Sequence, residues 1–289
     1  MSTTATGRTA AGRSATGEPS RPWRTIAMCW AVGVTSWALV AGTAIWFERS
    51  LRNGAVVTGY ALFALMLVLS LFNLRKRLLV LPVGTVRSWM IAHGVIGVLA
   101  IPIYFQHTGT LWPGGFYEQI IAIAFYAATL SGIAGYALER ILPRRLAHLG
   151  GEIIQERIPG EIAELRARAE ALVLKAVADT GSDTLGRYYA ESLDWYFWRP
   201  RFLLSHLVGG GRALRWIEGH LVALRRYLNE AERERLDALE ALALRKNRLD
   251  AHHALQSVLK LWLFVHIPAA VLLVALAAWH LLVVNIYAR

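Results

Sequence analysis

Four histidines within long apolar stretches constrain this chain more than any other feature. His93 and His107 stand fourteen residues apart in one stretch, and His266 and His280 stand fourteen residues apart in another. In an α-helix, fourteen residues at 100° each make about 1400°, roughly 40° short of four full turns, so both histidines of a pair lie on one helix face. At about 1.5 Å per residue they lie roughly 21 Å apart along the axis. Two such helices side by side would form two stacked bis-histidine sites, spanning most of a hydrocarbon core of about 30 Å.

Composition and hydropathy place these helices in a membrane. The chain has 289 residues, of which 55% are hydrophobic, and its mean hydropathy is +0.39. Five stretches of about 18 residues or more contain no Asp, Glu, Lys or Arg, namely 25–47, 55–72, 89–106, 119–137 and 261–287. The sequence therefore predicts an all-α integral membrane protein, a bundle of five spans with a helical insertion between the fourth and the fifth.

The rest of the chain divides around these spans. Residues 1–22 are rich in Ser, Thr, Gly and Ala and predict a disordered tail, followed by spans one to four within 23–137. Residues 138–257 predict a soluble helical segment, and 258–289 hold the fifth span. Inside the soluble segment we expect helices at 161–178 and 184–197, a joint at Gly209-Gly210-Gly211, and one long helix from about 230 that continues into span five.

Lys and Arg are distributed unevenly between the loops, which predicts orientation. Basic residues precede span one, fill the loop at 75–87 and follow span four, whereas the stretch from Gln106 to Glu118 has none. By the positive-inside rule the N-terminus and the insertion are cytoplasmic and the C-terminus is periplasmic, in a bacterial inner membrane. The same placement explains the net charge of +11 without a nucleic-acid partner. Spans three and five then run in the same direction, so His93 faces His266 near the cytoplasm and His107 faces His280 near the periplasm.

Haem iron is the ligand that best fits two such pairs, because it takes two axial bonds from opposite sides and its ring fills an apolar slot between helices. The alternatives are structural hydrogen bonds between helices and another metal. The single cysteine, Cys29, and the absence of Cys-x-x-Cys-His indicate non-covalent, b-type haems. Further candidate contacts are two cations for the haem propionates and two small residues that let a macrocycle approach, namely Arg87, Lys260, Gly94 and Gly97.

The pattern His93-x13-His107 on span three and His266-x13-His280 on span five resembles the haem-binding membrane domain of ferric reductases and NADPH oxidases, and more widely the respiratory dihaem b-type cytochromes. The resemblance covers about 90–137 and 260–287. It implies two b haems and transmembrane electron transfer. This sequence shows no counterpart of the family's sixth helix or its flavin and nicotinamide domain, and it inserts about 120 residues before span five.

We therefore expect a dihaem cytochrome b that carries electrons between a cytoplasmic or quinol donor and a periplasmic acceptor. As a subunit of a larger redox system it would work beside a flavin, iron–sulfur or c-type cytochrome protein, with quinone as a further partner. No Gly-x-Gly-x-x-Gly, Walker or nucleophile-elbow motif indicates a catalytic site of its own. Two other hypotheses stay open. One is a non-redox helical scaffold or receptor with structural histidines, and the other is a quinol or ferric reductase in its own right.

Overall fold

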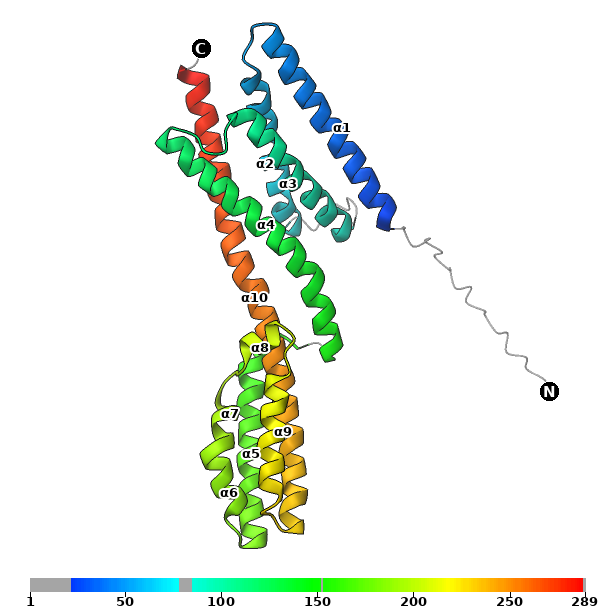
Figure 1. Ribbon diagram of the computed structural model, residues 1–289, viewed down its shortest axis with the longest axis vertical. Coiled ribbons are helices and arrows are strands. Elements are labelled where there is room, and N and C mark those ends of the chain that lie inside the picture. The colour runs from blue at the N-terminus through cyan, green and yellow to red at the C-terminus, as the bar shows by residue number, and fades with distance from the viewer. Residues whose placement is uncertain (1–21, 78–84, 152, 288–289) are drawn as a thin grey trace, which may run out of the picture. The chain divides into compact units, whose positions relative to one another are not determined.

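The computed structural model describes residues 22–77, 85–151 and 153–287, and within them every regular element is a helix (Figure 1). Residues 1–21 of the predicted tail lie outside the described residues. The elements are α1 (Pro22–Arg49), α2 (Gly54–Arg77), α3 (Val86–Thr108), α4 (Phe116–Leu149), a short 3₁₀ turn (Gln155–Arg157), α5 (Ile158–Thr180), α6 (Thr184–Tyr188), a π turn (Tyr189–Leu193), α7 (Asp194–Trp198), α8 (Leu203–Leu207), α9 (Arg212–Arg225) and α10 (Glu230–Tyr287).

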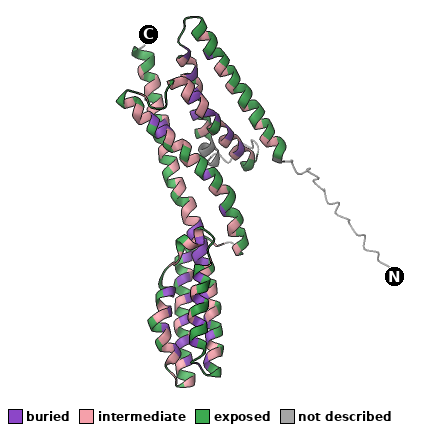
Figure 2. Ribbon diagram, viewed as in Figure 1, coloured by how far each residue is buried: buried purple, intermediate pink, exposed green. Residues whose placement is uncertain are grey.

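Five of these helices, α1 to α4 and α10, are long and apolar enough to cross a membrane. They contain the five predicted spans. At most 28% of the most apolar window of each helix is buried inside the protein, so most side chains in these windows are partly or fully exposed (Figure 2). Water would not support so much exposed apolar area, whereas hydrocarbon would. The fold is therefore all-helical and compatible with a membrane protein.

The chain forms two compact units. The first comprises α1, α2, α3, the start of α4 up to Phe125 and the end of α10 from Leu272. One cluster of buried residues lies between α1 and α3, where Ile91, Val95 and Leu99 pack against residues of α1. Gly33 permits this contact, because a Cβ atom there would lie 2.3 Å from Leu99 Cδ1.

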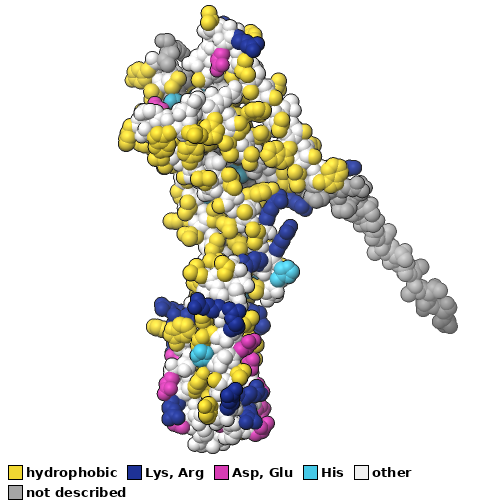
Figure 3. All heavy atoms as spheres, viewed as in Figure 1, with side chains coloured by type: hydrophobic (Ala, Val, Ile, Leu, Met, Phe, Trp, Pro, Cys, Tyr) yellow, Lys and Arg dark blue, Asp and Glu magenta, His cyan; other side chains and the backbone are white. Residues whose placement is uncertain are grey.

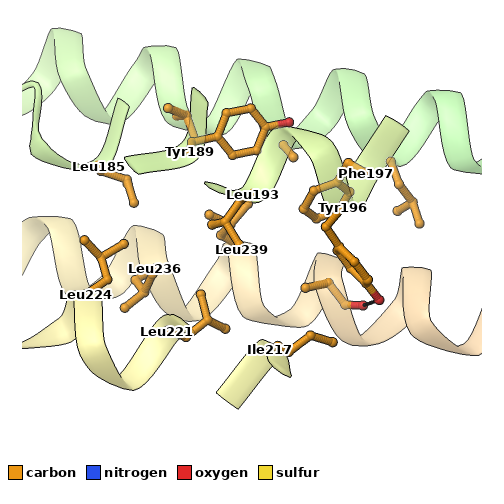
Figure 4. Packing of buried hydrophobic residues seen from close by; sticks show 14 of the residues in the cluster. Leu185, Tyr189, Leu193, Tyr196, Phe197, Ile217, Leu221, Leu224, Leu236 and Leu239 are labelled. Carbon is orange, nitrogen blue, oxygen red and sulfur yellow. Dashed lines mark hydrogen bonds between the residues drawn. The ribbon is translucent and has the colours of Figure 1, made fainter. Parts of the chain in front are cut away.

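The second unit extends from Tyr126 to Val271 and holds the predicted soluble segment. Here α5, α6, α7, α9 and the first half of α10 surround one apolar core, drawn in Figure 4. Helix α9 shows why they pack: Ala213, Ile217, Leu221 and Leu224 recur at helical spacing and are all buried. Aromatic residues fill the same core from the α6–α7 side, where Tyr189, Tyr196 and Phe197 point inward.

Local signals explain where the helices of this unit begin and end. Helix α10 begins with a capping box, in which Asn229 Oδ1 accepts from the Glu232 N–H at 2.9 Å and Glu232 Oε2 accepts from the Asn229 N–H at 3.0 Å. Helix α5 ends at Gly181, whose φ of 67° is left-handed. The predicted helix at 184–197 is observed at 184–198 with a π turn inside it. The predicted long helix is confirmed, since α10 is continuous from Glu230 to Tyr287 and includes Pro268.

One ion pair is completely buried in this bundle. Lys246 Nζ lies 2.6 Å from Asp250 Oδ2, and neither side chain is exposed. The ammonium also donates to the Arg199 carbonyl at 2.9 Å and lies 4.1 Å from the centre of the Tyr196 ring. Burial raises the pKa of Asp250 and lowers the pKa of Lys246, while their mutual attraction opposes both shifts.

Candidate functional site

The first unit brings two of the four predicted histidines together. His107, in the last turn of α3, and His280, near the end of α10, lie with their ring centres 6.4 Å apart and their ring planes at 87°. They are 173 residues apart in the sequence. The structure therefore brings these two side chains next to each other.

Polar contacts from two other helices hold the end of α10 in this position. The Tyr117 hydroxyl of α4 donates to the Leu276 carbonyl at 2.7 Å, and its ring lies against His280 with ring centres 6.2 Å apart. The Tyr60 hydroxyl of α2 donates to Asn285 Oδ1 at 2.7 Å. In an apolar environment such bonds help to define which faces of the helices meet.

The His107 ring is oriented by the start of α2. Its Nδ1 lies 2.9 Å from the Ala55 carbonyl oxygen and 3.3 Å from Thr58 Oγ1. A carbonyl can only accept, so Nδ1 carries the proton and a neutral ring has its lone pair on Nε2. Gly59 allows the close approach, because a Cβ atom there would lie 2.9 Å from His107 Cε1. The Nε2 atom of a neutral His107 is therefore the ring nitrogen that could bind a ligand.

His266 is held in the same way in the second unit. Its Nδ1 lies 2.9 Å from Ser131 Oγ on α4. The Ser131 hydroxyl donates its single proton to the Ala127 carbonyl at 2.6 Å, so it accepts from the histidine. Trp262 lies alongside, with its ring stacked on His266 and its indole N–H donating to the Ser131 carbonyl at 2.7 Å. The lone pair of a neutral His266 therefore also lies on Nε2.

The structure gives a position to the other predicted residues but does not test their predicted roles. His93 is half-buried on α3 in the first unit, whereas His266 belongs to the second, so their pairing stays a prediction. Arg87 is exposed in the first turn of α3. Lys260 is exposed as well and binds the Glu156 carboxylate at 2.6 Å, which a propionate would have to replace.

The two glycines of α3 are both half-buried, Gly94 and Gly97. No atom lies within 4 Å of the position that a Cβ of Gly97 would take, so the helix surface there is open.

The residues at the His107–His280 pair fit a bis-histidine haem. Iron bonded at about 2 Å to each imidazole nitrogen holds ring centres about 6 Å apart, since a ring centre lies about 1.1 Å behind its nitrogen. The observed 6.4 Å agrees with this value. Within the described ranges, no three His, Cys, Asp or Glu side chains gather into a metal-binding group. Two histidines would be enough to hold a haem, because the macrocycle itself binds the iron.

Sequence reasoning missed the residues that orient the histidines. Ala55 acts through its backbone, and Thr58 and Ser131 are small hydroxyl residues of a kind common in membrane helices. Nothing in the spacing of the sequence distinguishes them, because each lies on a different helix from the histidine it holds.

Comparisons with protein-family models, curated proteins and solved structures gave no match to this chain.

Proposed function

We propose that this protein is an integral membrane b-type cytochrome that binds two haems and passes single electrons across the bilayer. The observation that carries the proposal is the His107–His280 pair, in which two intramembrane imidazoles from distant helices lie at the separation that axial ligation of one iron requires. The Nδ1 hydrogen bonds of His107 and His266 support it, because metal-bound histidines regularly donate their other N–H to a carbonyl or another acceptor.

Each of these residues has a distinct role in the proposed site. His107 and His280 would hold one haem, and His93 with His266 would hold the second. Haem supplies a one-electron carrier when bound. The Ala55 carbonyl and Thr58 hydroxyl hold His107 in one tautomer and orientation, which raises the basicity of its Nε2. The apolar helices around the ligands exclude water.

We propose that the chain lies in a bacterial inner membrane. Its N-terminus and the bundle formed by α5 to α9 with the first half of α10 would be on the cytoplasmic side, and its C-terminus on the periplasmic side. Electrons would pass between a cytoplasmic or quinol donor and a periplasmic acceptor through one haem near each surface. A flavin, iron–sulfur or c-type cytochrome protein would exchange electrons with this chain, and Arg87 and Lys260 would hold propionates at the cytoplasmic edge.

The experiment that tests this proposal is a reduced-minus-oxidised visible spectrum of the full chain, purified from cells supplied with haem, with haem quantified as the pyridine haemochrome. We expect a b-type α-band and about two haems per chain. His280→Ala should leave about one haem. His220→Ala is the control, because His220 Nδ1 bonds within its own helix to the Trp216 carbonyl at 2.9 Å, and the haem content should not change.

The scaffold hypothesis predicts a different result. The same hydrogen bonds that orient His107 and His266 also join helices, as structural histidines do. A folded, haem-supplied protein without an α-band would refute the cytochrome proposal and favour the scaffold.

A further inference from the structure

One end of the bundle in the second unit carries exposed apolar side chains among arginines. Helix α8 and the turns around it leave Trp198 63%, Leu204 79% and Val208 83% exposed. Arg199 and Arg212, also exposed, flank them. Apolar and aromatic side chains beside basic ones are typical of segments that lie in the interface of a bilayer.

The α8 end of the bundle lies close to where α4 becomes apolar. Arg145 of α4 donates to the His206 carbonyl of α8 at 2.7 Å, and also to the Leu207 carbonyl. Arg145 follows Glu139, the first charged residue after the apolar stretch, by six residues, which is about 9 Å of helix. A headgroup layer is about 5–8 Å thick on each side of the hydrocarbon core. Side chains of α8 that point outward can therefore reach the headgroups.

A second set of contacts joins the turn between α4 and α5, at the same end of the bundle, to the start of the apolar half of α10. The Gln256 side chain donates to the Ile153 carbonyl at 2.8 Å, and Lys260 binds Glu156 at 2.6 Å. The apolar stretch of α10 begins at the next residue, Leu261. Ile154, in the same turn, is 53% exposed. Apolar groups on two separate turns are thus exposed near the start of the apolar stretches.

The position of the chain just before α8 is fixed by packing, and this keeps the apolar groups exposed. Phe202, just before α8, has a left-handed φ of 54°, which is uncommon for a bulky residue. Its ring packs against those of Trp195, Tyr196 and Trp216, with centres 6.0 to 6.4 Å apart. This packing anchors the segment from inside, while Trp198 and Leu204 remain outside the core.

We propose that the segment 198–212 rests on the bilayer surface that α4 and α10 enter. Trp198, Leu204 and Val208 would lie at the boundary of headgroups and acyl chains, and Arg199 and Arg212 would bind phosphates of anionic phospholipids. On the face seen in Figure 3, Lys and Arg side chains gather across one end of the bundle, which favours an anionic surface. The proposal rests on membrane insertion and does not depend on haem.

The test uses the full chain with Cys29→Ser, so that one introduced cysteine can carry an environment-sensitive fluorophore. Leu204→Cys is the probe. Leu174→Cys is the matched control, because Leu174 is a leucine of similar exposure, 70%, on α5. Both proteins are reconstituted into phosphatidylcholine vesicles with phosphatidylglycerol as the minor lipid, some of it carrying a headgroup nitroxide quencher.

We expect quenching at position 204 to exceed that at 174 by at least about twofold. Arg199→Gln with Arg212→Gln, or omission of phosphatidylglycerol, should reduce this difference. Equal quenching at the two positions would overturn the proposal. So would a fluorophore at 204 that is shielded from water but not quenched, because another protein surface, such as a second copy of the chain, would then cover it. No response to the arginine changes or to lipid charge would overturn the assignment to anionic phospholipid.

Discussion

The hydrogen bonds that Nδ1 donates determine which ring nitrogen of an intramembrane histidine is left to bind a ligand. At His107 the acceptor is the Ala55 carbonyl, and at His266 it is a serine hydroxyl whose own proton is used elsewhere. Both arrangements leave the Nε2 lone pair of the neutral ring for a ligand. The bond therefore selects one tautomer as well as one ring orientation.

The Thr58 hydroxyl is the contact to His107 that can be removed with least change of volume. We expect Thr58→Val to weaken haem binding at this site by about 10-fold or more, because loss of an outer partner of a ligating histidine loosens its orientation. The measurement is haem transfer from the full chain to an apo-globin acceptor. Thr43→Val is the matched control, since the Thr43 hydroxyl bonds only to carbonyls of its own helix, at 2.9 Å. Equal effects of both changes would contradict the predicted role of Thr58.

Among the elements, α10 is the one that combines two environments. Its first half packs in the bundle through Leu236, Leu239 and Ala243, and its second half is an apolar stretch without charged residues from Leu261. The helix continues because neither half contains a residue that must end it, and Pro268 is tolerated within it. The buried Lys246–Asp250 pair lies in the first half.

Removing one partner of this pair should cost more than removing both. We expect Asp250→Ala to lower the free energy of unfolding of the bundle by about 3–5 kcal/mol, since it leaves an uncompensated buried ammonium. The double change Lys246→Met with Asp250→Leu should be near neutral or stabilising, because apolar side chains avoid the desolvation cost. Urea unfolding of the full chain in detergent measures both. A double variant as unstable as the single one would contradict this account.

The same pair predicts how stability depends on pH. Burial raises the pKa of Asp250 to about 6 from 3.8 and lowers the pKa of Lys246 to about 8 from 10.5. The folded state therefore holds the Asp250 proton more tightly than the unfolded state does. The contribution of this group to the free energy of unfolding falls as pH rises from 3.8 to about 6. The folded state holds the Lys246 proton less tightly, and stability rises with pH from about 8 to 10.5. The pair therefore contributes least between these two ranges.

The check compares wild type with the Lys246→Met, Asp250→Leu variant, so that all other titrating groups cancel. The wild-type urea midpoint should improve relative to the variant both below about pH 6 and above about pH 8. A difference that does not vary with pH would show that the pair does not titrate as inferred.

For the whole molecule, the distribution of Lys and Arg predicts orientation in the membrane, and a reporter can test it. Alkaline phosphatase is active only where its disulfides form, which in a bacterium is the periplasm. We expect a fusion after residue 289 to be active and a fusion after Thr180, in the turn between α5 and α6, to be inactive. The reverse result would invert the topology and place the bundle in the periplasm.

The amino-acid sequence by itself predicted the five apolar helices, α5 and the helical stretch of α6 and α7, but not α8 or α9. Apolar stretches of membrane-spanning length and the amphipathic pattern within 161–178 predicted α1 to α5, and continuous helical character predicted α10, because hydropathy, periodicity and capping act over a few residues. Only the tertiary structure decided which side chains meet. The hydrogen bonds that His107 donates to Ala55 and Thr58, and that His266 donates to Ser131, join residues on different helices. The buried charges of Lys246 and Asp250 likewise depend on helices packed around them. Such contacts depend on which helix faces pack together, and no short stretch of sequence predicts them.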